Sequence, residues 1–383
     1  MHYLCSLINE QFIMKKILFI LFFHFIFLPL SAQKITLGTC QTRDGGTYKG
    51  EMVGGKPYGK GFTTYKNGDT FEGEYVKGKR QGYGVYTFSD GEKYEGEWFQ
   101  DQQHGRGTFY FKDNNKYVGL WYADYQEGHG VLYYFNGDVY DGNWKQDKRN
   151  GEGTYTFSNG AYYKGSWKND QKHGHGFFDW GDGTTYDGMW ANNVRQGKGV
   201  NHYADGDVYS GNWTNDLPDG KGIYKFSNGD VYEGNYVEGE RSGEGIIRYA
   251  NGDTYTGSFL KGNKEGRGTY VWKNGDSYTG YWSNDMQHGK GRLEKRNGDT
   301  YTGDFVNGKV EGEIDIRYHD KSRFKGIYKN GKRNGKAVEL LTNGKIFEGT
   351  YKNDVRVGKF IEKDSNGKII ATGHYENGKR FND

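Results

Sequence analysis

The chain has 383 residues, and 52 basic against 49 acidic side chains give it a formal net charge of +3. This near balance provides no overall attraction to nucleic acid, so we expect no nucleic-acid partner. A hydrophobic fraction of 33% is low, but 17% aromatic residues, 64 glycines and 3 prolines are more typical of hydrogen-bonded strands than of a disordered chain.

The first predicted element is an export signal that covers residues 1–32. Two lysines follow Met14, an apolar run extends over residues 17–30, and small residues end at Ala32. A positive start, an apolar centre and small residues describe a secretory signal. The apolar run is short for a membrane-spanning helix, which needs about 20 residues. We therefore predict cleavage after Ala32, and retention as a membrane anchor is the alternative.

The signal predicts an exported protein that is periplasmic, associated with the cell envelope, or secreted. Translation starts at Met1 or at Met14, and residues 1–13 fit poorly as part of a signal. Residues 33–45 form a lead-in to the main part of the chain. This segment contains Cys40, which is the only cysteine after the predicted cleavage point, so an internal disulfide is not expected.

From residue 46 onward the sequence repeats with a period of 23 residues. Every unit begins with an aromatic residue, and a glycine follows two positions later. The leading aromatic residues are Tyr48, Phe71, Tyr94, Tyr117, Tyr140, Tyr163, Tyr186, Tyr209, Tyr232, Tyr255, Tyr278, Tyr301, Phe324 and Phe347. A fixed period without insertions means that each unit contacts the next in the same way, as in stacked-repeat proteins.

Alternation within a unit predicts two strands. In the first unit, Tyr48, Gly50 and Met52 share one face of the first strand. A polar loop over residues 53–58 should lead to a return strand over residues 59–65. An Asn-Gly or Asp-Gly pair then turns the chain into the next unit, because such pairs favour tight turns.

The two faces of the predicted strands differ in composition. From Tyr75 to Trp213 the Met52 position holds Tyr or Trp in every unit, whereas the Glu51 position stays largely polar. One face should therefore carry a ladder of aromatic rings interleaved with glycines. Each ring is expected to cover the bare backbone of a neighbouring glycine, so that a single layer stabilises itself. The predicted core residues of the repeat are Tyr140, Gly142, Trp144, Gly151, Gly153, Tyr163, Gly165, Trp167, Tyr209, Gly211, Trp213, Tyr232, Gly234, Tyr255 and Gly257.

The pattern of Tyr-x-Gly-x-aromatic, a polar loop, Gly-x-Gly and Asn/Asp-Gly resembles the MORN repeats, named for a membrane occupation and recognition nexus. The resemblance covers residues 46–311, where several fixed positions recur together many times. It implies that each unit is a β-hairpin and that the hairpins stack. The expected fold class is all-β, an elongated single-layer antiparallel sheet that forms a twisted, solenoid-like ribbon.

Residues 312–383 depart from the pattern. The second glycine of the Gly-x-Gly pair becomes Ile314, Ala337 and then Phe360, and the spacing slips by one residue before Gly373. These units resemble a looser variant of the same repeat that caps the array, because the terminal units of repeat proteins are usually atypical. A separate functional module is the alternative.

Positive charge gathers between residues 321 and 361. Eight lysines and three arginines stand there against three acidic residues, which is a local net charge of +8. Basic clusters attract anionic surfaces, although a charged stretch is also the ordinary composition of a solvated face. The candidate anion contacts are Lys321, Arg323, Lys325, Lys329, Lys332, Arg333 and Lys336.

The sequence contains no recognisable catalytic motif. His104, His173 and His288 occupy equivalent positions in different units, so they are not expected to converge on a metal ion. Aspartates recur after the turn glycines, and turn chemistry explains them better than calcium binding. The Gly-x-Gly pairs precede strands rather than helices, which argues against dinucleotide loops. We expect no enzyme activity, no metal and no cofactor.

Three functions fit this pattern. A long repetitive surface suits a non-catalytic scaffold that contacts an unknown protein partner or associates with itself as a homo-oligomer. The basic C-terminal units suit peripheral binding to an anionic lipid surface. The aromatic face would suit glycan or cell-wall binding if its rings were free rather than used in folding. The sequence favours the scaffold and does not identify the partner.

Overall fold

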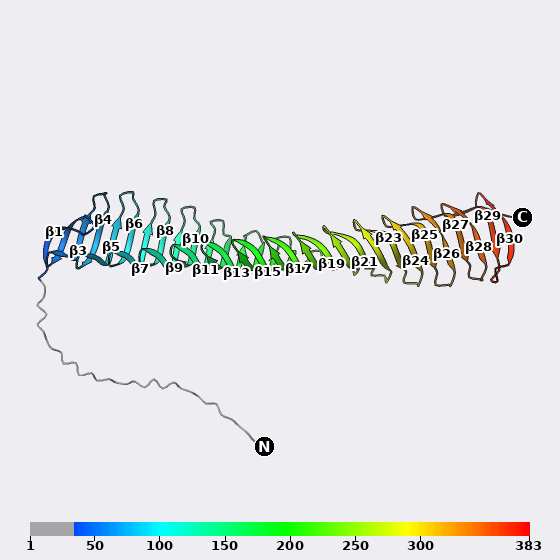
Figure 1. Cartoon of the computed structure of the whole chain (residues 1–383), viewed down its shortest axis with the longest axis horizontal. Coiled ribbons are helices and arrows are strands. Elements are labelled where there is room, and N and C mark those ends of the chain that lie inside the picture. Colours follow the sequence, from blue (N-terminus) through cyan, green and yellow to red (C-terminus); the bar gives the residue numbers. More distant parts are fainter. Residues whose placement is uncertain (1–33) are drawn as a thin grey trace, which may run out of the picture.

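The computed structural model describes residues 34–383, and the predicted signal at residues 1–32 lies outside the described residues. Every regular element in residues 34–383 is a β-strand, and 31 strands form one antiparallel sheet. The sheet stays open and forms a long, twisted ribbon, with β1 at one end and β30 at the other (Figure 1). The predicted fold class, a single-layer sheet of stacked hairpins, is confirmed.

From β2 to β29, each unit contributes a first strand of seven residues and a return strand of nine. The first strands are β2 (Thr47–Val53), β4 (Thr70–Val76), β6 (Lys93–Phe99), β8 (Lys116–Tyr122), β10 (Val139–Lys145), β12 (Tyr162–Lys168), β14 (Thr185–Ala191), β16 (Val208–Thr214), β18 (Val231–Val237), β20 (Thr254–Leu260), β22 (Ser277–Ser283), β24 (Thr300–Val306), β26 (Arg323–Lys329), β28 (Ile346–Lys352) and β30 (Ile369–Glu376). The return strands are β1 (Thr36–Gln41), β3 (Lys56–Thr64), β5 (Lys79–Thr87), β7 (Gln102–Tyr110), β9 (Tyr125–Tyr133), β11 (Lys148–Thr156), β13 (Gln171–Asp179), β15 (Val194–His202), β17 (Leu217–Lys225), β19 (Glu240–Arg248), β21 (Asn263–Val271), β23 (Met286–Glu294), β25 (Lys309–Arg317), β27 (Lys332–Leu340), β29 (Val355–Lys363) and β31 (Lys379–Asn382). Each strand pairs with the next one along the chain.

A two-residue turn joins the two strands of a hairpin, so the predicted polar loop over residues 53–58 is wrong. In the first unit β2 continues to Val53, β3 begins at Lys56, and only Gly54 and Gly55 lie between them. Both turn residues have positive φ, as a type I′ turn requires. In later units Asn, Asp, Lys, Gln and Glu also adopt this conformation. The composition of these segments therefore does not distinguish the two-residue turn from a longer polar loop.

The two positions of a Gly-x-Gly pair hold glycine for different structural reasons. Gly151 has a φ of 99° and lies where the register between β10 and β11 shifts, opposite the segment between Gly142 and Trp144. A bulge of this kind needs a residue that tolerates positive φ. Gly153 instead pairs with Gly142 and lies under the ring of Tyr140. The ring therefore covers the second glycine of the pair, and backbone conformation explains the first.

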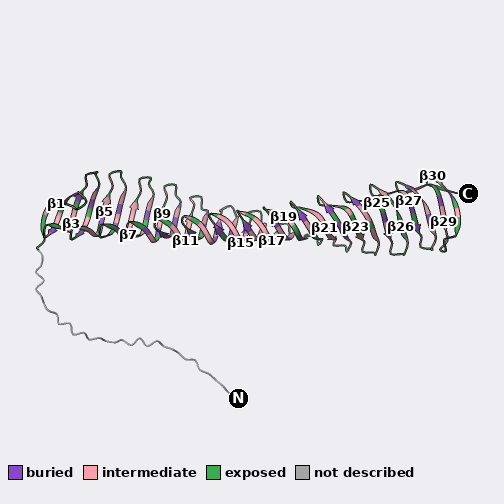
Figure 2. Cartoon of the chain, viewed as in Figure 1, coloured by how far each residue is buried: buried purple, intermediate pink, exposed green. Residues whose placement is uncertain are grey.

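Aromatic side chains on one face of the sheet form the core, and we call this side the aromatic face. The ring of Tyr140 packs edge-on against Trp144 of its own unit and Trp167 of the next, with centroid distances of 5.2 and 5.4 Å. Its hydroxyl donates to the carbonyl of Asn143 at 3.0 Å. Buried and exposed residues alternate along the strands (Figure 2). Rings laid on glycines thus replace the second layer against which a sheet normally packs.

The core residues named from the sequence all lie in this ladder apart from Gly151. The exposed fractions of the rings lie between 0 and 6%; these rings are Tyr140, Trp144, Tyr163, Trp167, Tyr209, Trp213, Tyr232 and Tyr255. A Cβ added to the glycine two residues after a tyrosine would approach the tyrosine hydroxyl to 2.8 Å or less; these glycines are Gly142, Gly165, Gly211, Gly234 and Gly257.

The core divides into two clusters near residue 311. The first extends from Tyr48 to Phe305, and the second from Ile314 to Phe360. In the second cluster larger side chains occupy the position of the ring-covered glycine, and Ile314 itself is 2% exposed. The sheet nevertheless continues across this point without interruption.

The slip in spacing before Gly373 is a bulge in β30. Lys363 pairs with Ile369 and Glu362 pairs with Ala371, so Ile370 is an additional residue between two paired ones. A bulge lets one extra residue enter a strand without changing which side chains face the core beyond it.

Candidate functional site

The side of the ribbon opposite the rings carries polar and aliphatic side chains, and we call it the second face. It consists of the residues at the positions of Lys49, Glu51, Lys60 and Phe62 in every unit. Because strand residues alternate between faces, these side chains point away from the aromatic core. The second face is therefore the long surface that the core leaves available for contacts.

A pocket of about 1170 Å³ lies on the second face between β13 and β20. Val200, Ile223 and Ile246 follow one another along it at intervals of 23 residues. One strand lies between successive members, so they are two inter-strand spacings apart, which is roughly 10 Å. Lys221 and Glu233 bring charges of both signs to the same pocket. An apolar row framed by charged groups can hold an apolar partner segment and fix its orientation.

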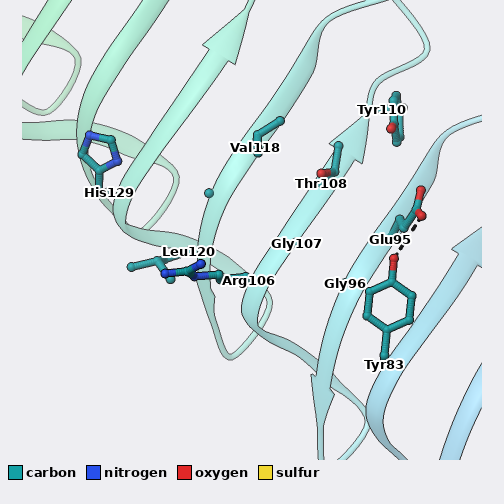
Figure 3. A pocket seen from close by; sticks show the side chains of 11 residues that line it. Tyr83, Glu95, Gly96, Arg106, Gly107, Thr108, Tyr110, Val118, Leu120 and His129 are labelled. Atoms are coloured by element: carbon teal, nitrogen blue, oxygen red, sulfur yellow. Dashed lines mark hydrogen bonds between the residues drawn. The ribbon is translucent and has the colours of Figure 1, made fainter.

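A smaller pocket of about 570 Å³ lies on the second face nearer the N-terminal end (Figure 3). Val118 and Leu120 on β8 are 40 and 39% exposed there, and Arg106 lies next to Leu120. Tyr83 donates a hydrogen bond of 3.0 Å to Glu95 at one side of the pocket (Figure 3). Apolar surface framed by charged and polar groups thus recurs along the second face.

A third pocket, of about 750 Å³, lies on the second face of the C-terminal units. Lys325, Lys336 and Lys359 line it together with two acidic residues, Glu313 and Glu348, and the aliphatic residues Ile327 and Val338. The two aliphatic side chains are 39 and 44% exposed. Lysines around exposed apolar surface are the combination that binds an anionic, partly apolar ligand.

The structure brings only two of the seven predicted anion contacts, Lys325 and Lys336, into this pocket. Lys321 has a φ of 72° and lies in a turn on one edge of the ribbon. Lys329 ends β26 and Lys332 begins β27, so both flank a turn on the opposite edge. Positive charge that is continuous in the sequence is therefore divided among three surfaces.

The two remaining candidates are arginines with partners inside the protein. Arg323 donates to Asp315 at 2.7 Å. Arg333 lies on the aromatic face, where its guanidinium stands 4.8 Å from the centroid of the Phe324 ring. A cation over a ring in this way contributes to packing. These arginines are accordingly occupied in the fold and are poor candidates for binding an anion.

Along one edge of the ribbon, an aspartate carboxylate in one turn accepts hydrogen bonds from the next turn, and we call this contact a clamp. This feature was missed in the sequence. Asp253 accepts hydrogen bonds from the hydroxyl of Tyr270 at 2.7 Å, the backbone N–H of Lys273 at 2.8 Å and the amide of Asn251 at 3.0 Å. The bonds from Tyr270 and Lys273 lower the pKa of Asp253. The spacing of 20 residues between Asp253 and Lys273 is the signal that could have indicated the clamp.

A second set of clamps follows the opposite edge. The carboxylate of Asp170 accepts from the backbone N–H of Arg149 at 3.0 Å and from its Nε at 3.1 Å. The same guanidinium lies 4.4 Å from the ring of Trp167. Each arginine in this position thus caps the aromatic ladder and ties one turn to the next.

The structure shows no arrangement suited to metal chemistry within residues 34–383. No group of three or more His, Cys, Asp or Glu side chains there is placed to hold a metal ion. His104, for example, lies between the rings of Phe99 and Tyr122, with centroid distances of 5.4 and 5.1 Å. None of the described residues belongs to a helix that is long and apolar enough to cross a membrane.

An open ribbon of stacked hairpins, with one face used as its own core and the other left free, defines a repeat-based binding scaffold. The family model described as the MORN repeat matches the chain over most of its length, and the chain belongs to this family. The matched segments are residues 48–70, 71–93, 94–116, 117–139, 140–162, 163–185, 186–208, 209–231, 232–254, 255–277, 278–300, 324–346 and 347–359. The unit at residues 301–323 is passed over, and it is the first in which the second glycine is replaced, by Ile314.

Three of the solved structures to which the chain is similar show a distant relation. The wild-type TCP10 domain of Danio rerio CPAP is 14% identical, with 57% of this chain and 98% of that chain covered and a TM-score of 0.31. The SAS-4 (dCPAP) TCP domain of Drosophila melanogaster, in complex with a proline-rich motif of Ana2, is 16% identical, with 47 and 90% covered and a TM-score of 0.28. A virginiamycin B lyase from Staphylococcus aureus is 10% identical, with 81 and 97% covered and a TM-score of 0.12. These scores carry no argument about function, and no curated protein matches the chain.

Proposed function

We propose that this chain is a non-catalytic assembly scaffold of the cell envelope that binds a protein partner along the second face. The observation that carries the proposal is the row of Val200, Ile223 and Ile246 in the pocket of about 1170 Å³. Membership of the MORN repeat family, which is generally non-catalytic, supports a binding role. The export signal predicted in residues 1–32 supports the envelope location.

The burial of the aromatic ladder favours the second face over the rings as a contact surface. Tyr209 has no exposed surface and Trp213 is 2% exposed. A ring needs a free face to stack on a sugar, so the ladder is poorly suited to binding glycans. The outer row of rings at the Tyr65 position is only partly buried, and it is the surface that this alternative would have to use.

The test places charge in the apolar row. Ile223→Glu combined with Ile246→Glu should abolish chemical cross-linking to the partner in an intact envelope fraction, because carboxylates would replace the apolar contacts. Val237→Glu combined with Leu260→Glu is the matched control, since these residues are 54 and 53% exposed at hairpin ends and do not line the pocket. If both variants cross-link to the same proteins as the wild type, the second face is not the binding surface.

Location is tested separately. Cell fractionation with mass spectrometry of the N-terminus should find the chain in the envelope, periplasm or medium, beginning at Gln33. Recovery from the cytosol with residues 1–32 still attached would contradict the envelope part of the proposal and leave partner binding open to its own test.

The pocket of the C-terminal units favours a second candidate, which is binding to an anionic membrane surface. Lys325, Lys336 and Lys359 converge there on exposed aliphatic groups. Vesicles that contain phosphatidylserine should sediment the wild type at low salt, and Lys325→Glu with Lys336→Glu should abolish this. Lys329→Glu with Lys332→Glu makes the same change of charge at one edge of the ribbon and should have a smaller effect. Equal losses would mean that overall charge, not this pocket, controls adsorption.

A further inference from the structure

The ribbon begins with an incomplete unit. Gly38 on β1 stands 23 residues before Gly61, and Cys40 stands 23 residues before Thr63, so β1 corresponds to a return strand. One side of β1 pairs with β2. Within residues 34–383 no strand pairs with its other side, where every later return strand has the first strand of its own unit.

Among residues 34–383, no ring covers Gly38 in the way that rings cover its equivalents. A Cβ added to Gly61 would meet the ring of Tyr48 at 2.1 Å, whereas a Cβ added to Gly38 would meet only the Met52 side chain, with the sulfur at 2.7 Å. Met52 stands where the following units carry an aromatic residue. Trp121, for example, contacts the ring of Tyr94 in the preceding unit. A flexible methionine therefore lies over Gly38 in place of a missing ring, and it can move to contact one.

The outer edge of β1 also lacks the features that usually protect a free strand. The strand has the sequence TLGTCQ, which contains neither a charged residue nor a proline. Leu37 is 84% exposed and the preceding Ile35 is 56% exposed. At the other end of the ribbon β31 is short and carries Lys379 and Arg380. The N-terminal edge is thus the one that favours strand pairing.

We propose that the outer edge of β1 is a strand-addition site for a partner strand that carries an aromatic residue two positions before a glycine. The strand runs antiparallel to β1, with its glycine opposite Gly38 and its aromatic residue opposite Cys40, in the register that joins β2 to β3. Backbone hydrogen bonds along the edge supply affinity, and the ring over Gly38 supplies specificity. This site is separate from the second face, so each proposal can fail without the other.

Other occupants fit this edge less well. Two β1 strands from two copies can pair antiparallel about Gly38, but Thr36 then faces Cys40 and no ring reaches the glycine. Joining β31 to β1 would place two return strands side by side and break the antiparallel pattern. Within this chain, Phe25 and Phe27 stand 23 residues before Tyr48 and Gly50. The position that needs a glycine therefore holds a phenylalanine.

A peptide with the sequence of Val139–Lys145 (VYDGNWK) tests the site. Fluorescence anisotropy of the labelled peptide should show saturable binding to the purified chain. Replacing the peptide tyrosine by alanine should weaken binding at least about tenfold, because the ring contact is lost. Alkylation of Cys40 should slow when the peptide is bound, since the ring lies opposite the thiol.

Two protein variants locate the binding. Gly38→Val should abolish it, and the fold should tolerate this change because the added atoms meet a flexible methionine. Thr39→Val, which lies on the second face of the same strand, should bind like the wild type. Absence of saturable binding, or equal binding by Gly38→Val, overturns the proposal. So does a dimer in which Thr36→Cys forms a disulfide with Cys40 of another copy, because the edge is then occupied by the chain itself.

Discussion

A Cβ added to Gly211 would come within 2.4 Å of the hydroxyl of Tyr209, which folds back over its own strand. The backbone of Gly222 lies within 2.6 Å of the same point, so the surroundings cannot give way. We expect Gly211→Val to lower the free energy of unfolding by about 3 kcal/mol. Loss of a nearby exposed charge in Lys225→Ala should change it by less than about 0.5 kcal/mol. Guanidinium unfolding followed by tryptophan fluorescence compares the stability of the two variants. Equal midpoints would contradict the explanation that the ring of Tyr209 requires glycine at position 211.

Asn201 marks a weak point in the ladder. It has no exposed surface, its Oδ1 accepts from Arg195 at 3.1 Å, and its Nδ2 has no partner. Equivalent positions elsewhere hold Leu132 and Tyr155. Asn201→Leu keeps the size of the side chain and removes the unpaired amide, so we expect stability to rise by about 1 kcal/mol. Asn201→Ala should instead lower it by leaving a cavity. A lower unfolding midpoint for Asn201→Leu would show that the amide is satisfied.

The turn clamps predict sensitivity to acid. Hydrogen bonds lower the pKa of Asp253 in the folded chain, so its contribution is present above the pKa of the unfolded state and is lost as pH falls through the folded pKa. The unfolding midpoint of the wild type should exceed that of Asp253→Asn at pH 7, and the difference should shrink below about pH 4. Parallel curves from pH 7 to pH 3 would mean that the carboxylate does not clamp the turns.

The buried tyrosines predict sensitivity to alkali. Burial raises the pKa of Tyr186 to about 12, compared with about 10 in an unfolded chain. The neutral form is therefore favoured by folding, and its contribution is complete below pH 10 and declines as the pH rises toward 12. Absorbance at 295 nm should show tyrosine ionisation together with unfolding. Ionisation of all tyrosines near pH 10 in a chain that keeps its β-sheet circular dichroism would refute the burial of the ladder.

Much of the fold could be predicted because its determinants are local. The alternation of Tyr48, Gly50 and Met52 and the recurring Asn-Gly pairs indicate strand faces and turns directly. The hairpin turn at Gly54 and Gly55 was missed, since type I′ turns in later units use residues that look like an ordinary polar loop. The position of Ile370 as a bulge residue was implied by the slip in spacing, although only strand pairing shows it.

The sequence by itself determined that this is an all-β repeat ribbon with one aromatic face, because period and alternation are properties of neighbouring residues. The tertiary structure alone decided how residues about 20 positions apart meet. It separated Lys321 from Lys336 onto different surfaces and bound Asp253 to Lys273. It also placed Gly38 on a strand whose outer edge pairs with no other strand of residues 34–383. Such relations depend on the register between strands, which is set by packing across the sheet and not by the order of residues along one strand.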